Sequence, residues 1–146
     1  FFADPTRFVG SSWLSRAEEY VTSGQLHHAA AALRRAIARA IDDGDRSRAW
    51  LRLGRLYQEL DHTRKALLCY YNAYRKDQEA WIQALMADAY LQDGDPYEAL
   101  VCYRTAIQAM PGDPEVRAGY ERARRLVDES GGHVHGYTLR QERLAR

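Results

Sequence analysis

The chain has 146 residues, the length of one domain, which is enough to bury an apolar core without disulfides or a structural metal. Hydrophobic residues make up 46% of it and its formal net charge is +1, so bulk electrostatics give no reason to expect nucleic acid or an anionic membrane as the partner. No apolar run approaches the roughly 20 residues that cross a bilayer, so we expect no direct membrane insertion.

Two helices are predicted between residues 10 and 46, after an N-terminal arm of residues 1–9. An extra helical turn that begins at Asp4-Pro5 is the alternative for this arm. The first helix carries Trp13, Arg16, Ala17 and Tyr20, and the turn and second helix carry Gly24, Ala29, Leu33 and Ala36. The acidic cluster at residues 42–45 is rich in turn-forming residues, and we interpret it as a turn with helix caps before the next segment.

Residues 47–79 contain the most complete pattern of the chain. Residues 50–57 read WLRLGRLY, a spacing of W-x2-L-G-x2-Y, and Ala66, Tyr70 and Ala73 follow. Residues 80–113 repeat this frame less completely. The matching positions there are Met86, Ala87, Tyr90, Gly94, Ala99, Tyr103, Ala106 and Pro111.

Two Asp-Pro pairs predict helix starts, because the carboxylate caps the helix and proline is tolerated at the first helical position. Asp95-Pro96 begins the second helix of the third segment, and Asp113-Pro114 begins a last helix at residues 114–130. Its many Arg and Glu residues, with apolar residues on one face, are typical of a helix that caps a stack and meets water on its outer side. A tail at residues 131–146 follows Gly131-Gly132.

A repeat of about 34 residues accounts for these segments. Tyr20, Tyr57 and Tyr90 recur at the same two intervals as the alanines at positions 29, 66 and 99, so two independent markers share one register. Over about residues 10–113 the pattern resembles the tetratricopeptide repeat family, although the first repeat has Arg16-Ala17 in place of Leu-Gly and the third has Gln83 in place of Trp. The resemblance implies an all-α fold, a right-handed α-solenoid of antiparallel helix hairpins. It has three repeats (about 10–46, 47–79 and 80–113) and about seven helices, in a domain that spans residues 10–130.

The resemblance also implies a concave groove lined by the first helix of each repeat, which would bind a peptide or protein segment. Its candidate residues here are Glu18, Arg48, Arg52, Arg55, Trp81, Asp88 and Arg122. The three arginines at i, i+4 and i+7 share one helix face, and arginine binds carboxylates with two hydrogen bonds, so an acidic or C-terminal peptide is one interpretation. The other is a solvated face in which Glu18 and Asp88 neutralise these arginines within the chain.

Two further features of the groove leave alternatives open. Trp81 is an aromatic anchor for a ligand in one interpretation and a core residue between repeats in the other, which we prefer. The lysine and asparagine clamp with which some family members hold chaperone tails is missing, because Leu14, Glu18, Arg52, Trp81 and Leu85 stand at its positions. The sequence therefore does not predict a receptor for chaperone tails.

No catalytic pattern is present, so we expect a binding protein without a cofactor rather than an enzyme: there is no glycine-rich phosphate loop and no nucleophile motif. His133 and His135 have a spacing that suits a metal only in an extended strand, and we prefer a tail without a metal. Cys69 and Cys102 occupy equivalent repeat positions roughly 10 Å apart, too far for a disulfide, so both are predicted to be buried free thiols.

The expected function is that of an adaptor or scaffold in a larger bacterial assembly or regulatory protein. The bacterial assignment rests on 19 Arg against only two Lys, which indicates a GC-rich genome. A secretion or assembly chaperone for one client is the first alternative, and a recruitment domain from a multidomain enzyme is the second. We expect a cytoplasmic protein, with the periplasm as the alternative because the chain starts at Phe1, and the arm or the tail offers a route to a homo-oligomer.

Overall fold

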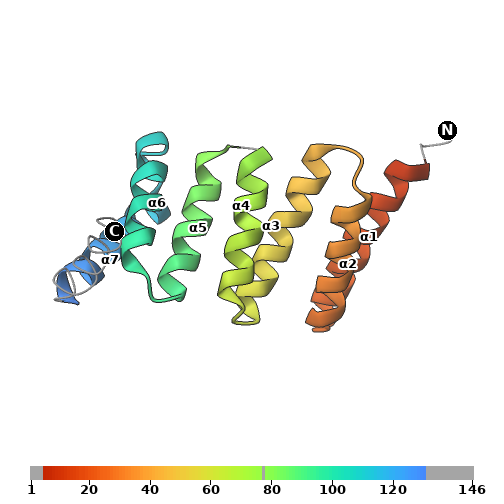
Figure 1. Cartoon of the computed structure of the whole chain (residues 1–146), viewed down its shortest axis with the longest axis horizontal. Helices are drawn as coiled ribbons and strands as arrows, with labels where there is room; N and C mark the ends of the chain where they lie inside the picture. Colours follow the sequence, from red (N-terminus) through yellow and green to blue (C-terminus); the bar gives the residue numbers. More distant parts are fainter. Residues whose placement is uncertain (1–4, 77, 131–146) are drawn as a thin grey trace, which may run out of the picture. The chain divides into compact units, whose positions relative to one another are not determined.

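The computed structural model describes residues 5–76 and 78–130, with side chains from residue 13 onward (Figure 1). These residues form seven α-helices and no strand. The helices are α1 (Pro5–Thr22), α2 (Leu26–Arg39), α3 (Asp43–Glu59), α4 (Thr63–Lys76), α5 (Ala80–Gln92), α6 (Pro96–Ala109) and α7 (Pro114–Glu129). The all-α fold expected from the sequence is thus confirmed. The described residues divide into two compact units, the first ending at Ile82 and the second beginning at Gln83, with the boundary inside α5.

In the first unit the helices pack as successive hairpins, with α1 against α2, α3 against α4, and α2 against α3 (Figure 1). Small residues sit at the helix crossings: Ala29, Ala49 and Ala66 are completely buried. A polar contact joins the two hairpins, because Arg34 Nη1 of α2 donates a hydrogen bond of 3.0 Å to the hydroxyl of Tyr57 in α3. The tyrosine at this repeat position therefore links one repeat to the one before it.

The turns inside the hairpins recur in the same register as the marker residues. Gly24, Asp61 and Gly94 have positive φ angles of 78°, 59° and 79°, and each follows its marker tyrosine by one helical turn. In each case the amide of the next residue donates to a carbonyl in the last turn of the preceding helix, for example Asp95 N to Tyr90 O at 2.9 Å. This left-handed turn ends a helix at low cost where glycine occupies it.

Helix starts follow the predicted capping residues. Asp95 Oδ1 accepts from the amide of Glu98 at 3.1 Å, and Asp113 Oδ1 accepts from the amide of Glu115 at 2.9 Å. The acidic cluster at 42–45 supplies a helix cap, as expected, but it is not a turn. Asp42 caps α3 by accepting from the amide of Asp45 at 2.7 Å, so the rest of the cluster forms the first helical turn.

The first helix begins at Pro5, so residues 5–9 continue α1 and follow the alternative given above for the N-terminal arm. Proline suits the first turn of a helix because its missing amide has no partner there. The two histidines at 133 and 135 and the rest of the predicted tail lie outside the described residues. None of the described helices is long and apolar enough to cross a membrane.

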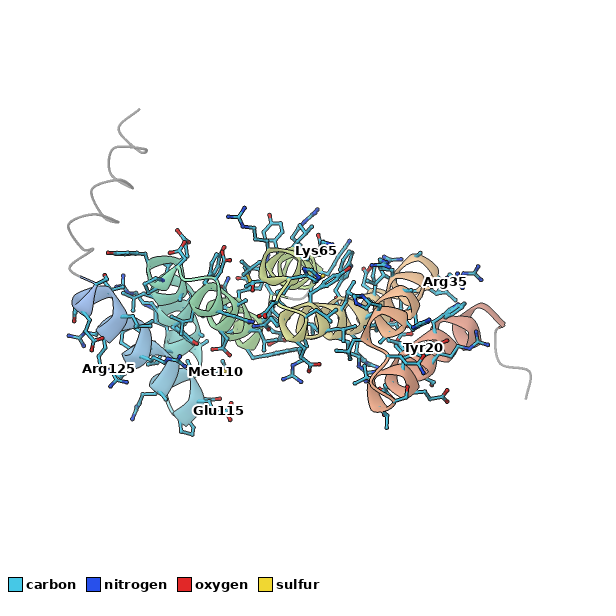
Figure 2. All side chains as sticks on the ribbon, turned by 90° about the horizontal axis from the view of Figure 1, so that it is seen from below. Tyr20, Arg35, Lys65, Met110, Glu115 and Arg125 are labelled. Carbon is cyan, nitrogen blue, oxygen red and sulfur yellow. The ribbon has the colours of Figure 1, made fainter. Side chains whose placement is uncertain are left out.

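In the second unit α6 packs against α7 (Figure 1). The buried contact is made of small residues around one tyrosine: Ala106 and Ala123 are fully buried, and Tyr103 is 2% exposed. Figure 2 shows Glu115 and Arg125 toward opposite ends of α7. This helix has a buried face with Val116 and Ala123 and an outer face of charged residues, as expected of a capping helix.

Both cysteines are free and buried, as predicted. Burial raises the pKa of the Cys69 thiol to about 12 and that of Cys102 to about 11.

Because the thiolate is the reactive form, we expect both cysteines to react with a disulfide reagent such as DTNB at pH 8 roughly a hundredfold or more slowly than a free thiol. Titration should give two equivalents of thiol rapidly in denaturant and neither of them rapidly in buffer; fast reaction of the folded chain would contradict the burial.

Candidate functional site

A pocket of about 430 Å³ lies between α1 and α3 of the first unit, and we call it the first pocket. Its floor is apolar, because Ala17, Leu33 and Leu56 are 2–3% exposed. Its rim is charged and open to solvent. The complete lining is Ala17, Glu18, Val21, Thr22, Leu33, Arg52, Arg55, Leu56 and Glu59. Three of the predicted groove residues, Glu18, Arg52 and Arg55, therefore come together here.

The charges of the first pocket are only partly paired. Arg52 Nη1 forms an ion pair with Glu18 Oε1, and the two side chains are 40% and 61% exposed. Arg55 has no ion pair with any residue in the described part of the chain, including Glu59, which follows it by one helical turn. The guanidinium of Arg55 thus keeps its donors available at the edge of an apolar cavity.

A second pocket, of about 620 Å³, lies among α5, α6 and α7 of the second unit. Its lining is Asp88, Leu91, Gln92, Tyr103, Glu115, Ala118, Gly119 and Arg122. The buried ring of Tyr103 passes close to Gly119, and its hydroxyl donates a hydrogen bond to Asp88 Oδ1. Two more of the predicted residues, Asp88 and Arg122, therefore line one cavity.

Four opposing effects set the ionisation of Asp88. Burial of its carboxylate by the pocket walls raises its pKa most, although the side chain keeps one side open to solvent. The hydrogen bond from Tyr103 lowers this pKa, the charge of Glu115 raises it, and the charge of Arg122 lowers it. The net pKa of Asp88 is raised. Burial and the neighbouring carboxylate also raise the pKa of Tyr103, which stays a neutral donor.

The two pockets occupy equivalent places in the repeat. Glu18, Arg55, Asp88 and Arg122 take the same position in successive repeats, so each pocket has an acid on one helix and an arginine at the matching position of the next repeat. The floors correspond too, because Leu33 and Tyr103 share one position in the first and third repeats. Each unit therefore has a pocket at the same place in the repeat, but the side chains that line the two pockets differ.

The other two predicted residues lie outside both pockets. Arg48 Nη1 is 3.7 Å from Asp45 Oδ1 in a local ion pair of α3. Trp81 is 43% exposed, so the preferred interpretation as a core residue was wrong. Its neighbour Ile82 is completely buried, and adjacent side chains of a helix point about 100° apart, so the indole is turned toward solvent.

The sequence model of the tetratricopeptide repeat-like domain matches residues 4–125. The chain belongs to this family. Among curated proteins, none matches this tetratricopeptide chain.

Solved structures show the same fold. The tetratricopeptide domain of OM64 from Arabidopsis has a TM-score of 0.71, with 15% identity over 82% of this chain and 98% of that one. SycD, a type III secretion chaperone of Yersinia enterocolitica in complex with a peptide of the translocator YopD, has a TM-score of 0.64, with 21% identity over 82% and 89%. PcrH of Pseudomonas aeruginosa, in complex with the chaperone-binding region of PopB, also has a TM-score of 0.64, with 21% identity over 86% and 97%.

Several pocket residues of this tetratricopeptide chain were not predicted: Leu33 and Tyr103 at the floors, Glu59 at an edge, and Gly119. Glycine inside a helix costs about 1 kcal/mol relative to alanine, so its presence in α7 was a signal of close packing that could have been used. In the described part of the chain no three His, Cys, Asp or Glu side chains gather into a set that could hold a metal ion.

Proposed function

We propose that this protein binds a polypeptide segment of a partner protein at the first pocket. An apolar side chain of the segment fills the cavity above Leu33 and Leu56, and a carboxylate beside it binds Arg55. The single observation that carries the proposal is an arginine without an ion-pair partner in the described residues, at the edge of a cavity with an apolar floor. Arginine holds a carboxylate with two parallel hydrogen bonds, and the floor supplies apolar contact area.

Arg52 has a different role in this proposal from Arg55. Its charge is engaged by Glu18, so it sets the shape and polarity of the edge, while Arg55 contacts the ligand. The proposal thus combines the two interpretations of the arginine face: one arginine is neutralised within the chain and the other is available to a partner.

We propose the role of an adaptor or scaffold for this domain. A chaperone that holds one client is the second candidate, since SycD and PcrH, which have the same fold, were solved with segments of YopD and PopB. Affinity capture from native extract with mass spectrometry separates the two roles. A chaperone should capture one client whose captured form is readily cleaved by protease, whereas an adaptor should capture folded, protease-resistant partners. The recruitment domain of a multidomain enzyme remains the third candidate, and reading the full gene around this chain tests it.

The carboxylate contact is tested with Arg55→Glu. Once a captured partner has been reduced to a binding peptide, this variant should bind it at least about tenfold more weakly, because it replaces attraction by repulsion at the same site. Binding is measured by isothermal titration calorimetry, with circular dichroism to show unchanged helix content.

The matched control is Arg64→Glu, the same charge reversal at an exposed position of α4 outside the pocket. It should leave the affinity within about twofold of the wild type, since the charges are distant and screened. Glu59→Gln should raise the affinity, because it removes a negative charge close to the carboxylate of the bound peptide. If Arg55→Glu binds as tightly as Arg64→Glu, Arg55 is not the contact.

A further inference from the structure

The second pocket lacks one charged group that the first pocket has. In the first pocket the acid Glu18 is paired with Arg52. One repeat later the position of Arg52 is Leu85, and one repeat further it is Gly119, in the wall of the second pocket. Asp88 stands where Glu18 stands in the first pocket. In the first pocket this repeat position supplies the guanidinium that pairs with Glu18. In the second pocket the same position is glycine, so it supplies no such partner to Asp88.

Glycine at position 119 is required by the floor of the pocket. A Cβ on Gly119 would lie 2.5 Å from the Cε1 and Cζ atoms of Tyr103. The absent side chain thus makes room for the tyrosine, whose hydroxyl reaches Asp88. The result is an acid fixed by one donor, with open cavity where the first pocket has an arginine side chain.

A buried tyrosine at this position does not need a carboxylate as its acceptor. In the first unit the equivalent residue, Tyr70, is completely buried and donates its hydroxyl hydrogen to the neutral amide oxygen of Gln58. Asp88 accepts from Tyr103 in the same way, but it carries a charge and it is exposed at the opening of the second pocket. Satisfying the tyrosine alone therefore does not account for a charged acceptor in this place.

We propose that the second pocket binds a basic side chain, the guanidinium of arginine or the ammonium of lysine, with Asp88 as its ion-pair partner. The bound group takes the part that Arg52 plays toward Glu18 in the first pocket. Leu91, Ala118 and the ring of Tyr103 line the cavity for the methylene groups of such a side chain, and a volume of about 620 Å³ has ample room for it. The basic group is taken to belong to the bound polypeptide, and in that respect the inference rests on the proposed function.

Arg122 does not prevent this binding. In the first pocket the corresponding residue, Arg55, lines the same cavity as Arg52, so two guanidinium groups already share one pocket of this chain. The second pocket also has an additional acid, Glu115, at the start of α7 (Figure 2). With Asp88 and Glu115 against Arg122, its formal charge is −1 before a ligand binds.

The test uses the full chain and two small probes, N-acetyl-arginine methylamide and the citrulline analogue, which has the same length and a neutral urea. Each is titrated into 15N-labelled protein and followed by NMR at the amides of Ala118 and Gly119. The arginine probe should bind about fivefold or more tightly than the citrulline probe, and Asp88→Asn should remove this difference. Asp128→Asn, the same change on α7 outside the pocket lining, should keep it.

Equal binding of the two probes, an unchanged preference in Asp88→Asn, or shifts confined to the lining of the first pocket would each overturn the proposal. Asp88→Asn retains an oxygen that accepts from Tyr103, so the variant keeps the packing of the site. A failure of the proposed function can be distinguished from a failure of this inference. Loss of Arg55-dependent peptide binding leaves the arginine probe unaffected, and failure of the probe leaves peptide binding at Arg55 unaffected.

Discussion

Replacing Gly54 with alanine should destabilise the first unit by about 2 kcal/mol, although alanine is the better helix former by about 1 kcal/mol. A Cβ at this position would lie 2.5 Å from Cε1 and 2.8 Å from Cδ1 of Tyr70. The ring cannot tilt away easily, because it is completely buried and its hydroxyl donates to Gln58. Overpacking therefore outweighs the gain in helix propensity.

The effect can be observed in the first unit alone. All three tryptophans lie within residues 1–82, so tryptophan fluorescence reports the unfolding of this unit. A loss of about 2 kcal/mol corresponds to a fall of roughly 10 °C in the melting temperature for a unit of this size. The ring of Tyr70 occupies the space beside position 54, and only glycine leaves that space free.

Two comparisons test the cause of this loss. Gly112→Ala, in the second unit, places a methyl group where no heavy atom lies within 4 Å, and it should leave the melting temperature of the whole chain, followed by circular dichroism, nearly unchanged. In a Tyr70→Leu background the aromatic ring is gone, so Gly54→Ala should become neutral or stabilising. A Gly54→Ala variant that melts like the wild type would show that the approach of α3 to α4 is looser than described.

The repeat and its caps were predictable because each depends on short stretches of sequence. Tyr57 and Ala66 recur with their partners at a fixed spacing, and a carboxylate before proline, as at Asp95 and Asp113, acts within its own helical turn. These features need no knowledge of distant contacts. The family match over residues 4–125 and the seven described helices agree with them.

The site was predictable only at the level of the helix face. The sequence placed Glu18, Arg52 and Arg55 on one surface, but it left open which arginine is neutralised, because that depends on which side chain reaches across to α1. Trp81 was misjudged because the rotation of one helical residue decides between core and solvent, and Ile82 took the buried position. Pairs that join different helices, such as Tyr103 with Asp88, have no signature along the chain.

Replacing Gly119 with alanine should destabilise the second unit by about 1–2 kcal/mol and weaken the contact between Tyr103 and Asp88. The new Cβ would lie 2.5 Å from ring carbons of Tyr103 and 2.7 Å from its hydroxyl oxygen. Because the tyrosine is 2% exposed and the new Cβ would lie against both its ring and its hydroxyl oxygen, the hydroxyl cannot keep its present position beside the carboxylate.

The pH dependence of this loss identifies its cause. The hydrogen bond from Tyr103 lowers the pKa of Asp88, so losing it raises a pKa that already lies above the ordinary value of 3.8. With the folded pKa above the unfolded one, the ionised carboxylate costs stability at neutral pH, and this cost is relieved as the pH falls through the folded pKa. The stability difference between wild type and Gly119→Ala, measured by thermal unfolding followed by circular dichroism, should therefore be larger at pH 7 than at pH 4.

The same comparison in an Asp88→Asn background separates packing from charge. Asparagine does not titrate, so the part of the loss that depends on pH should vanish while the steric part stays. Other carboxylates titrate equally in both members of each pair and cancel in the difference. A loss with the same pH dependence in both backgrounds would mean that Gly119 acts on another acid, and Asp88 would lose its place as the residue that the tyrosine positions.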